Sequence, residues 1–491
     1  MENLTLSTSV PRPSTAYLDH NWAGGHQSLT EEYDYWIDEI EGEIPQELKG
    51  TVFRNGPGLL DVGGTPLYHP FDGDGMICAL TFDQGKAHFR NRFVKTAGYL
   101  AEQAAGKNSV SGGCLGLLSR GGWLANAFDI NFKNIANTHV IYWAGKLLAL
   151  WEADQPYRLD PATLETLGLE DFSGLLKPGD PFSAHPRILK GATAAEDRLV
   201  TFSVKPGLSS VVKVYEFDTQ ANLVHQDQFS MPGFAFIHDF AVTPHYYIFF
   251  QNPVTLNPLP FVLGFKGAGE CITFKKGQPT QIWLLPRNGS GHLIKAATEA
   301  CFVFHHANAY EQDDQVIIDS ICYDSFPKLD PQVDFRDINF DTVPPAQLWR
   351  FRLSLTSFQV ERQPLVTRSC EFPALDPRQV SQPYRFVYLG AADAATGNAP
   401  LQALLKVDLQ TGAEELWSAA PQGFMGEPVF IPHPAVAEQG WLVALVYDGD
   451  RNRSDVVILA TENIKQGPIA RLALKHHVPY GLHGSFTPTL F

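Results

Sequence analysis

Short apolar strands joined by polar turns recur along the whole chain. The recurring unit is an apolar strand, a turn rich in Asp, Gly, Thr or Lys, and a second strand, as in LTFDQGKAHF from Leu80. Seven such hairpins begin at Leu80, Tyr157, Tyr215, Ile272, Phe351, Lys406 and Ile458, and the six intervals average 63 residues. A four-stranded propeller blade needs roughly 40–50 residues, and longer loops extend it to this spacing. The pattern predicts an all-β, seven-bladed β-propeller, with a sandwich or two β domains as the alternative.

The rest of the chain fits one large domain. The 41 Gly and 35 Pro are spread along the sequence, as many tight turns require, and no low-complexity linker divides it. We therefore expect residues 1–30 to form an N-terminal extension and residues 31–491 a single propeller. We expect the irregular segments, of which residues 100–124 are the longest, to form a dome of loops and helices over the active site.

Charge and cysteine usage limit the classes of function. The formal net charge of −16 disfavours nucleic acid as a partner. The six cysteines form no C-x-x-C pair, and the N-terminus lacks a signal-peptide pattern, so we expect reduced thiols and a cytoplasmic protein. Two apolar stretches, residues 115–128 and 256–265, are predicted to make shallow, peripheral contact with membranes. Buried loops are the alternative interpretation of both.

Four of the 16 histidines share one setting. His185, His238, His305 and His483 each lie among apolar or aromatic residues and each follow a hairpin by 23 to 33 residues. In a propeller the chain returns at that point to the innermost strand of the next blade. The four imidazoles are therefore predicted to meet in one axial channel, where they suit iron, zinc, copper or nickel. Any one of them alone would be read as an ordinary core histidine.

Three glutamates occupy comparable places in the remaining blades. Glu371 and Glu427 follow their hairpins by 20 and 21 residues, and Glu152 is the candidate in the blade with the long insertion. A metal-bound histidine usually donates its second N–H to a carboxylate, so these residues are predicted to orient three of the four rings. His306 adjoins His305, but side chains of neighbouring strand residues point to opposite faces, so only one of the two can reach the axis.

The motifs around these residues resemble those of the carotenoid cleavage oxygenases over nearly the whole chain, and particularly their cyanobacterial, apocarotenoid-cleaving members. They are FRNGPG, HPFDGDGM, NIANTHVIYW, SAHPR, FIHDFAVT, FHHANAYE, EFP, GEPVF and LHGS. The resemblance implies Fe²⁺ as the cofactor, held by four histidines, and it selects His305 over His306. It implies that Glu152, Glu371 and Glu427 support the ligands and that Thr138 limits access to a vacant coordination position.

The resemblance further implies cleavage of a double bond, the 15,15′ bond, in apocarotenals or apocarotenols with O₂, giving retinal-type aldehydes. Trp151, Phe236 and Phe304 lie beside site residues in the sequence and are candidate walls of a substrate tunnel, although ordinary core packing would explain them equally. Cleavage of stilbenoid phenols and isomerisation of retinoids are alternatives within the family. A non-catalytic propeller that binds carotenoid or a protein partner is a further alternative, and iron content distinguishes it.

Overall fold

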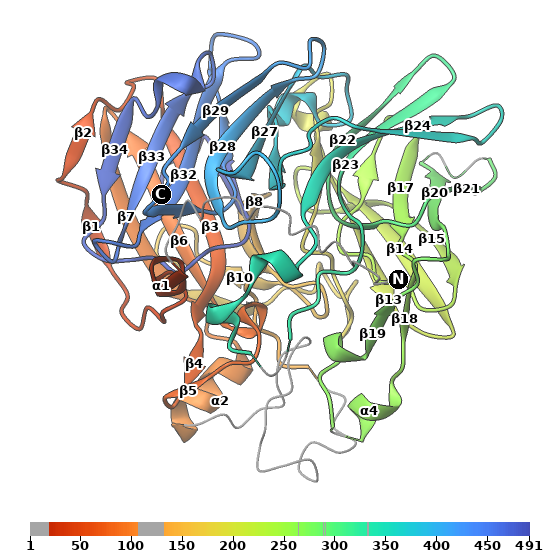
Figure 1. The fold of residues 1–491 in the computed structure, drawn as a ribbon, viewed down its shortest axis with the longest axis horizontal. Coiled ribbons are helices and arrows are strands. Elements are labelled where there is room, and N and C mark those ends of the chain that lie inside the picture. Colours follow the sequence, from red (N-terminus) through yellow and green to blue (C-terminus); the bar gives the residue numbers. More distant parts are fainter. Residues whose placement is uncertain (1–18, 107–131, 264, 288, 290, 331–332) are drawn as a thin grey trace, which may run out of the picture.

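Seven antiparallel sheets radiate from a common hub in the computed structural model, which describes residues 19–491 except 107–131, 264, 288, 290 and 331–332 (Figure 1). Each sheet is one propeller blade, and its strands follow one another outward from the hub. The blades comprise, from the hub outward, β35 (Gly484–Thr487), β3 (Gly50–Leu59), β6 (Asp74–Asp83), β7 (Lys86–Phe93) and β1 (Asp34–Trp36) in blade 1; β8 (His139–Trp143), β9 (Lys146–Leu150), β10 (Tyr157–Leu159) and β11 (Thr166–Leu169) in blade 2; β12 (Arg187–Leu189), β13 (Arg198–Lys205), β14 (Ser209–Phe217) and β15 (Leu223–Pro232) in blade 3; and β16 (Ala241–Val242), β17 (Tyr246–Gln251), β20 (Thr280–Pro286) and β21 (Ile294–Thr298) in blade 4.

The remaining three blades complete the ring of the described residues. They comprise β22 (Phe302–Gln312), β23 (Gln315–Tyr323), β24 (Ala346–Ser354) and β25 (Val360–Pro364) in blade 5; β26 (Cys370–Ala374), β27 (Phe386–Ala392), β28 (Leu401–Asp408) and β29 (Glu414–Ser418) in blade 6; and β30 (Gly423–Met425) with β31 (Val429–Pro432), then β32 (Gly440–Asp448), β33 (Arg453–Ala460), β34 (Ala470–Ala473) and β2 (Ile40–Gly42) in blade 7. The fold is thus the predicted seven-bladed propeller.

The ring is closed by strands from opposite ends of the sequence. In blade 1 the late strand β35 pairs with β3, with Phe53 opposite Ser485. In blade 7 the early strand β2 pairs with β34, with Glu41 opposite Arg471. Because each of these blades mixes early and late strands, neither sheet can be completed until both ends of the sequence are in place.

The hydrophobic core is divided into wedges between the blades. A separate buried cluster lies between each pair of neighbours, for example Val52 and Leu80 of blade 1 against Val443 and Val456 of blade 7. The same arrangement recurs around the ring. Both faces of each inner and middle strand are therefore covered, which explains the continuous burial of strands such as β3. Several innermost strands contact those of the next blade, namely β35 with β8 and β31, and β22 with β16 and β26.

One predicted hairpin is placed differently from expectation. The segment from Ile272 was expected to be the outer pair of a blade, but β19 (Ile272–Phe274) pairs with β18 (Val254–Leu256) in a separate small sheet. The outer pair of blade 4 is β20 and β21. The other six hairpins join strands that are adjacent both in sequence and in the sheet. Four of them are the outer pairs of blades 2, 3, 5 and 6, whereas in blades 1 and 7 the strands β1 and β2 lie outside the hairpin.

Several elements lie outside the blades. The helices α2 (Ala97–Ala105) and α4 (Leu259–Val262) and the small sheet of β4 (Asp61–Val62) and β5 (Thr65–Pro66) gather below the blades in Figure 1. The helix α1 (Asp19–Gly24) leads into a cluster in which Trp22 packs against Phe340 and Tyr480. The predicted membrane-contact segment 115–128 lies outside the described residues. In the part of the chain that is described, no helix has the length and apolar character needed to cross a membrane.

Candidate metal centre

Four histidines from four blades converge at the hub. His185 precedes β12, His238 precedes β16, His305 lies in β22, and His483 precedes β35. One ring nitrogen from each lies within 4.8 Å of those of the other three. The Nε2 atoms of His185 and His238 are 2.9 Å apart. His185, His305 and His483 are buried and His238 is partly buried, so the cluster is almost enclosed.

A bulge in β22 separates the adjacent histidines of blade 5. The register between β22 and β23 shifts between Val303 and His306, so one extra residue is accommodated there. His305 turns toward the hub. His306 lies away from it, with Nδ1 2.7 Å from the hydroxyl oxygen of Ser320 and its ring against Phe250. Among the described residues, only His305 of this pair belongs to the cluster.

Three of the histidines share their second nitrogen with a carboxylate. The Nδ1 atoms of His238, His305 and His483 lie 2.5, 2.6 and 2.9 Å from carboxylate oxygens of Glu152, Glu371 and Glu427, respectively. The pairing assigns the N–H to Nδ1 in each ring and leaves Nε2 free of hydrogen. The rings therefore present lone pairs to the centre of the cluster, as metal ligation requires.

Glu371 is held by an unusual stretch of backbone. Its side chain accepts hydrogen bonds from the Tyr323 hydroxyl at 2.9 Å and from the backbone N–H of Phe372 at 2.6 Å. Phe372 has φ = +54° and lies in a register shift of β26. Its ring packs against the imidazoles of His305 and His483, with centroids 5.8 and 5.4 Å away. A bulky residue in the left-handed region is strained by about 1–3 kcal/mol, and such strain is typical of functional sites.

Glu427 is instead supported by a buried cation. Arg54 of β3 donates to a carboxylate oxygen and to the backbone carbonyl of Glu427, both at 2.9 Å, and to the carbonyl of Leu482 at 3.1 Å. The backbone N–H of Gly484 donates to the same carboxylate oxygen at 2.7 Å. Arg54 thus fixes both the carboxylate partner of His483 and the backbone immediately before that histidine.

A second buried ion pair links the backbones of three blades. Arg187 donates to Asp239 at 2.5 Å and to the carbonyl of His306 at 3.0 Å, and the N–H of His306 donates to Asp239 at 2.8 Å. These residues lie within two positions of His185, His238 and His305. Burial raises the pKa of Asp239, but the charges of Arg187, His306 and His305 and the hydrogen bond from the His306 N–H together outweigh it, and the pKa is lowered. The pair holds three ligand-bearing segments together.

The pKa values of the clustered histidines are shifted in opposite directions. Burial, reinforced by the neighbouring histidines, holds the pKa of His185 and of His483 well below the ordinary value. For His305 burial acts in the same direction, but the charge and hydrogen bond of Glu371 outweigh it and raise its pKa. The carboxyl of Glu371 responds in turn: burial opposes ionisation, and His305 lowers its pKa below the ordinary value. A metal ion at the centre would compete with protons for all these rings.

The residues predicted to line a substrate tunnel or to limit access to the metal lie beside the histidine cluster. Phe304 packs edge-on against His238 with ring centroids 5.5 Å apart, and Phe236 packs against Phe304 at 6.3 Å. Trp151 is buried next to Glu152 in the sequence. Thr138 is buried, and its carbonyl accepts a hydrogen bond from the backbone N–H of His483 at 3.1 Å. All four belong to segments that border the cluster.

The position of Glu152 differs from the predicted one. It was expected at the innermost position of the blade that follows the Leu80 hairpin, but the innermost strand of blade 2 is β8, and Glu152 follows β9 in the loop toward β10. It still reaches His238, with a carboxylate oxygen 2.5 Å from Nδ1. The innermost position is occupied by Thr138 and His139 instead.

Six residues at the site were given no role from the sequence. They are Arg54, His139, Arg187, Asp239, Tyr323 and Phe372. All except Tyr323 belong to the motifs FRNGPG, NIANTHVIYW, SAHPR, FIHDFAVT and EFP, so membership of a motif was the only signal that could have drawn attention to them. Each acts through a backbone carbonyl, a strained dihedral angle or a hydrogen bond to a carboxylate. Such contacts leave no pattern in a single sequence.

The donor set fits a divalent transition metal. Four neutral imidazoles suit iron, zinc, copper or nickel, and four nitrogens within 4.8 Å of one another can share one ion. Among the described residues, Nε2 of His305 is a buried polar atom without a hydrogen-bond partner, as expected for a nitrogen reserved for a metal. Fold and site together therefore define a propeller protein with an all-histidine metal site.

Comparison with known proteins places the chain in a family. Residues 26–488 match the family model described as RPE65, retinal pigment epithelial membrane protein. The chain is 52% identical to the apocarotenoid-15,15′-oxygenase of Synechocystis sp., with 99% of this chain and 100% of the relative covered. A crystal structure of a cobalt-substituted form of the Synechocystis enzyme superposes with a TM-score of 0.94 at 52% identity, covering 97% of this chain and 100% of that one. A lignostilbene-α,β-dioxygenase isozyme of Sphingomonas paucimobilis is 32% identical over 91% of this chain and 93% of the relative. The chain belongs to the RPE65 family of carotenoid oxygenases.

Proposed function

We propose that this chain is an iron(II)-dependent dioxygenase that cleaves the 15,15′ double bond of apocarotenoids. The observation that carries the proposal is the four-histidine cluster with its three carboxylate partners, in a chain that is 52% identical over nearly its full length to an enzyme named for that reaction. Apocarotenals or apocarotenols and O₂ are the substrates, and two carbonyl compounds, one of them of the retinal type, are the products.

His185, His238, His305 and His483 would hold the metal, with Glu152, Glu371 and Glu427 orienting three of them. Ferrous iron bound there supplies the redox chemistry that O₂ requires, which zinc cannot supply. Four protein ligands leave up to two positions of an octahedral ion open. The ligands carry no charge, and the three carboxylates at the outer edge compensate the dication in a site with little solvent.

The side chains of this protein position the substrate and exclude water. No acid or base is needed to transfer a proton to or from an olefin, so the contribution of the site is orientation, which can account for a large share of a barrier. Thr138 and Trp151 border the cluster on the blade 2 side and Phe304 on the blade 4 and 5 side. We assign Thr138 to limiting access to an open ligand position and the aromatic residues to aligning one double bond with the metal.

An aromatic band gives the direction of approach. Phe304, beside His238, packs against Phe302 at 4.8 Å, and Phe302 packs against Phe326 at 5.0 Å. The same cluster includes Phe236 and Leu256, the last residue of β18. Since α4 follows β18 closely in the sequence, the band connects the metal centre to the α4 region, and a rod-like apolar polyene suits such a lining.

The α4 region also carries exposed apolar side chains. Leu259 and Phe265 are 61% and 53% exposed, and Phe132, exposed by 37%, stacks on Phe261 with centroids 5.6 Å apart. We assign this surface, defined by Leu259, Phe265, Phe132 and Phe261, to shallow contact with the membrane in which apocarotenoids dissolve. The substrate would then pass from the lipid to the aromatic band without crossing water.

Cleavage of stilbenoid phenols is the second candidate. The lignostilbene dioxygenase shares the family at 32% identity, compared with 52% for the apocarotenoid enzyme. The band from His238 to β18 consists of phenylalanines and aliphatic residues together with Tyr323, whose hydroxyl already donates to Glu371, so its lining favours a hydrocarbon chain over a hydroxylated ring.

The experiment combines metal analysis with product identification. Purified protein is expected to contain iron near one equivalent and to convert a series of apocarotenals under O₂ into two carbonyl products whose masses define the 15,15′ bond. His305→Ala is expected to lose the metal and to lower kcat/KM by more than about 100-fold, beyond the 10- to 100-fold effect typical of lost outer partners.

The adjacent histidine provides the matched control. His306→Gln can retain the hydrogen bond to Ser320 and is expected to keep iron and activity, because His306 lies outside the cluster. Protein that binds zinc in place of iron, or full activity in His305→Ala, would contradict the proposal. Turnover of hydroxylated stilbenes in preference to apocarotenals would favour the second candidate.

A further inference from the structure

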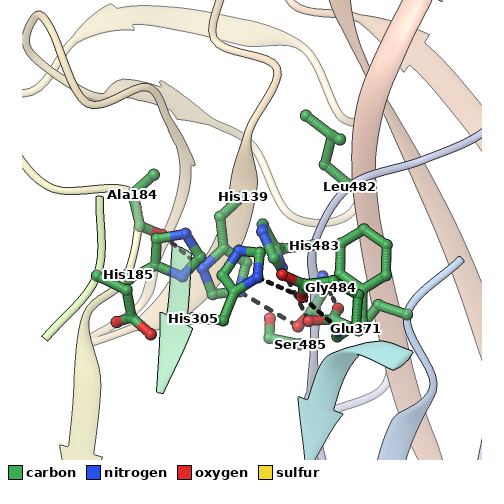
Figure 2. A network of polar contacts seen from close by, with 12 residues as sticks. His139, Ala184, His185, His305, Glu371, Leu482, His483, Gly484 and Ser485 are labelled. Atoms are coloured by element: carbon green, nitrogen blue, oxygen red, sulfur yellow. Dashed lines mark hydrogen bonds and ion pairs between the residues drawn. The ribbon is translucent and has the colours of Figure 1, made fainter. Parts of the chain in front are cut away.

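A fifth histidine lies against the cluster without joining it. His139 begins β8, the innermost strand of blade 2, which contributes none of the four clustered histidines. Its ring lies between His185 and His483 in Figure 2, with centroid distances of 6.0 and 5.6 Å. It is partly buried, so its nitrogens depend on protein groups for hydrogen bonds.

Both ring nitrogens of His139 face backbone carbonyls next to clustered histidines. Nδ1 lies 2.7 Å from the carbonyl oxygen of Ala184, the residue before His185. Nε2 lies 3.2 Å from the carbonyl oxygen of Gly484, the residue after His483. His185 belongs to blade 3 and His483 to blade 1, so one side chain in blade 2 spans the two blades on either side of it.

The main chain around His139 is itself fixed. Asn55 of β3 donates to the carbonyl of His139 at 2.9 Å, and the carbonyl of Thr138 accepts the N–H of His483 at 3.1 Å. The backbone of His483 is therefore fixed relative to Thr138 and His139, where β8 begins. Ala184 is fully buried, so its carbonyl has no solvent alternative to the ring of His139.

We propose that His139 is a positioning residue of the metal centre: its ring bonds the backbone before His185, while its own chain segment is bonded to the backbone of His483 through the carbonyl of Thr138, so the residue sets the separation of the two histidines that shared metal binding needs. This inference rests on the proposed metal site. His185 is the clustered histidine without one of the three carboxylates, and the bond from His139 to Ala184 takes the place of that support. The residue orients ligands and touches neither metal nor substrate.

The donor can be identified from the geometry. Carbonyl oxygens only accept hydrogen bonds, and a neutral imidazole carries one N–H. The shorter contact, from Nδ1 to Ala184, is the one assigned to that hydrogen. An asparagine at this position can present its amide N–H where Nδ1 lies, a glutamine presents it closer to Nε2, and a leucine presents neither. These three substitutions separate the bond to Ala184 from the volume of the side chain.

The test uses Co²⁺ as the probe in metal-free protein, because its visible absorption reports the geometry of the ligands. His139→Leu is expected to weaken Co²⁺ binding by about 10- to 100-fold and to change the absorption bands, as loss of a partner that orients ligands does. His139→Asn is expected to restore most of the affinity and the wild-type bands. A role in folding alone would lower the melting temperature of the metal-free protein without changing the bands.

His476 provides the control. Its Nδ1 lies 2.7 Å from the carbonyl oxygen of His477, a bond like that of His139, but it is not among the clustered histidines. His476→Leu is expected to leave Co²⁺ affinity unchanged. Wild-type affinity and bands in His139→Leu, or no recovery in His139→Asn, would overturn the inference.

Three further outcomes are decisive. If His139→Leu does not fold, tighter Co²⁺ binding by His139→Asn than by His139→Gln supports the bond to Ala184, and equal binding overturns it. Wild-type protein that takes up no Co²⁺ would overturn the proposed metal centre and this inference with it. Normal uptake by every variant overturns the role of His139 alone and leaves the metal centre standing.

Discussion

Individual residues at the hub carry conformations and contacts that would be costly elsewhere. Phe372 keeps a positive φ because the bulge around it lets its N–H bond to Glu371 while its ring packs on two histidines. Arg54 is buried and paired with Glu427. The strain and desolvation are offset by the packed blades around them, so the site is assembled by the fold and held in place before any ligand binds.

A residue outside the site gives a pH prediction. His26 is 8% exposed and packs edge-on against Trp22, Phe335 and Tyr480. Burial, aided by the charge of Arg336, lowers its pKa to about 3. Between pH 6.5 and 3 the unfolded chain binds a proton that the folded protein does not, so stability falls as pH falls through this window. From pH 7 to pH 5 the loss is about 2 kcal/mol, at 1.36 kcal/mol per unit.

The measurement is chemical denaturation of wild type and His26→Phe at both values of pH. The phenylalanine keeps the aromatic packing and cannot titrate, so its loss of stability on acidification is expected to be smaller than that of wild type by this amount. Equal losses would show that His26 is not the group responsible.

At the scale of single residues, the sequence predicted which residue types form the site better than it predicted the contacts that they make. Four histidines and three glutamates were recognisable because metal ligation and its carboxylate partners follow known pairings. The bond from His139 to Ala184 and the contact from Arg54 to Leu482 end on carbonyls, which every residue carries. No residue type marks such an acceptor, so only the three-dimensional arrangement reveals it.

Among the secondary-structure elements, tight hairpins were predictable and long connections were not. Six of the seven recurring hairpins are paired strands within a blade, four of them at its outer edge, because strands separated by a short turn have little choice of partner. In blade 4 the chain inserts β18, α4 and β19 between β17 and β20, so the strand at Ile272 pairs outside the blade. Glu152 was misplaced for a similar reason, since the long insertion obscured which strand of blade 2 is innermost.

Lys133, Asp74 and Glu102 form a buried ion triad that joins the segment before β8 to β6 and α2. Nζ of Lys133 lies 2.6 Å from Asp74 at the start of β6 and 2.7 Å from Glu102 in α2, and all three side chains are at most 3% exposed. The sequence DGDG around Asp74 therefore serves an internal ion pair. Lys133→Met leaves two buried carboxylates facing each other and is expected to reduce the free energy of unfolding by about 3–5 kcal/mol.

The compensating variant tests this explanation. Combining Lys133→Met with Asp74→Asn and Glu102→Gln removes every charge of the triad and is expected to recover most of the lost stability in guanidinium denaturation. A single variant within 1 kcal/mol of wild type, or a triple variant no better than the single one, would contradict it.

At the scale of the whole molecule, the blades act as wedges around one axis. Seven separate hydrophobic clusters seal the interfaces between neighbours, so the hub is rigid on all sides. Outside the ring, the exposed apolar surface at α4 contrasts with the formal net charge of −16. Attachment to lipid would therefore rest on apolar contact and be opposed by negative headgroups.

Vesicle binding measures both effects. The protein is expected to float with neutral phosphatidylcholine vesicles and less with vesicles containing phosphatidylserine. Since a large apolar side chain contributes about 1.5–3 kcal/mol when buried, Leu259→Glu with Phe265→Glu is expected to reduce the partition coefficient at least about tenfold per site. Leu223→Glu, at an exposed position of β15 in blade 3, is the control and is expected to bind like wild type. Equal binding by all variants would contradict the assignment of the α4 surface.

The order of the four histidines along the chain has a consequence for biosynthesis. A ribosome makes His185, His238 and His305 early, but His483 only after almost 180 further residues, together with the strand β35 that closes the ring. A nascent chain therefore cannot assemble the complete ligand set while it is being translated. Binding of a metal by all four histidines must follow synthesis of the closing strand, so only a finished molecule offers the complete site.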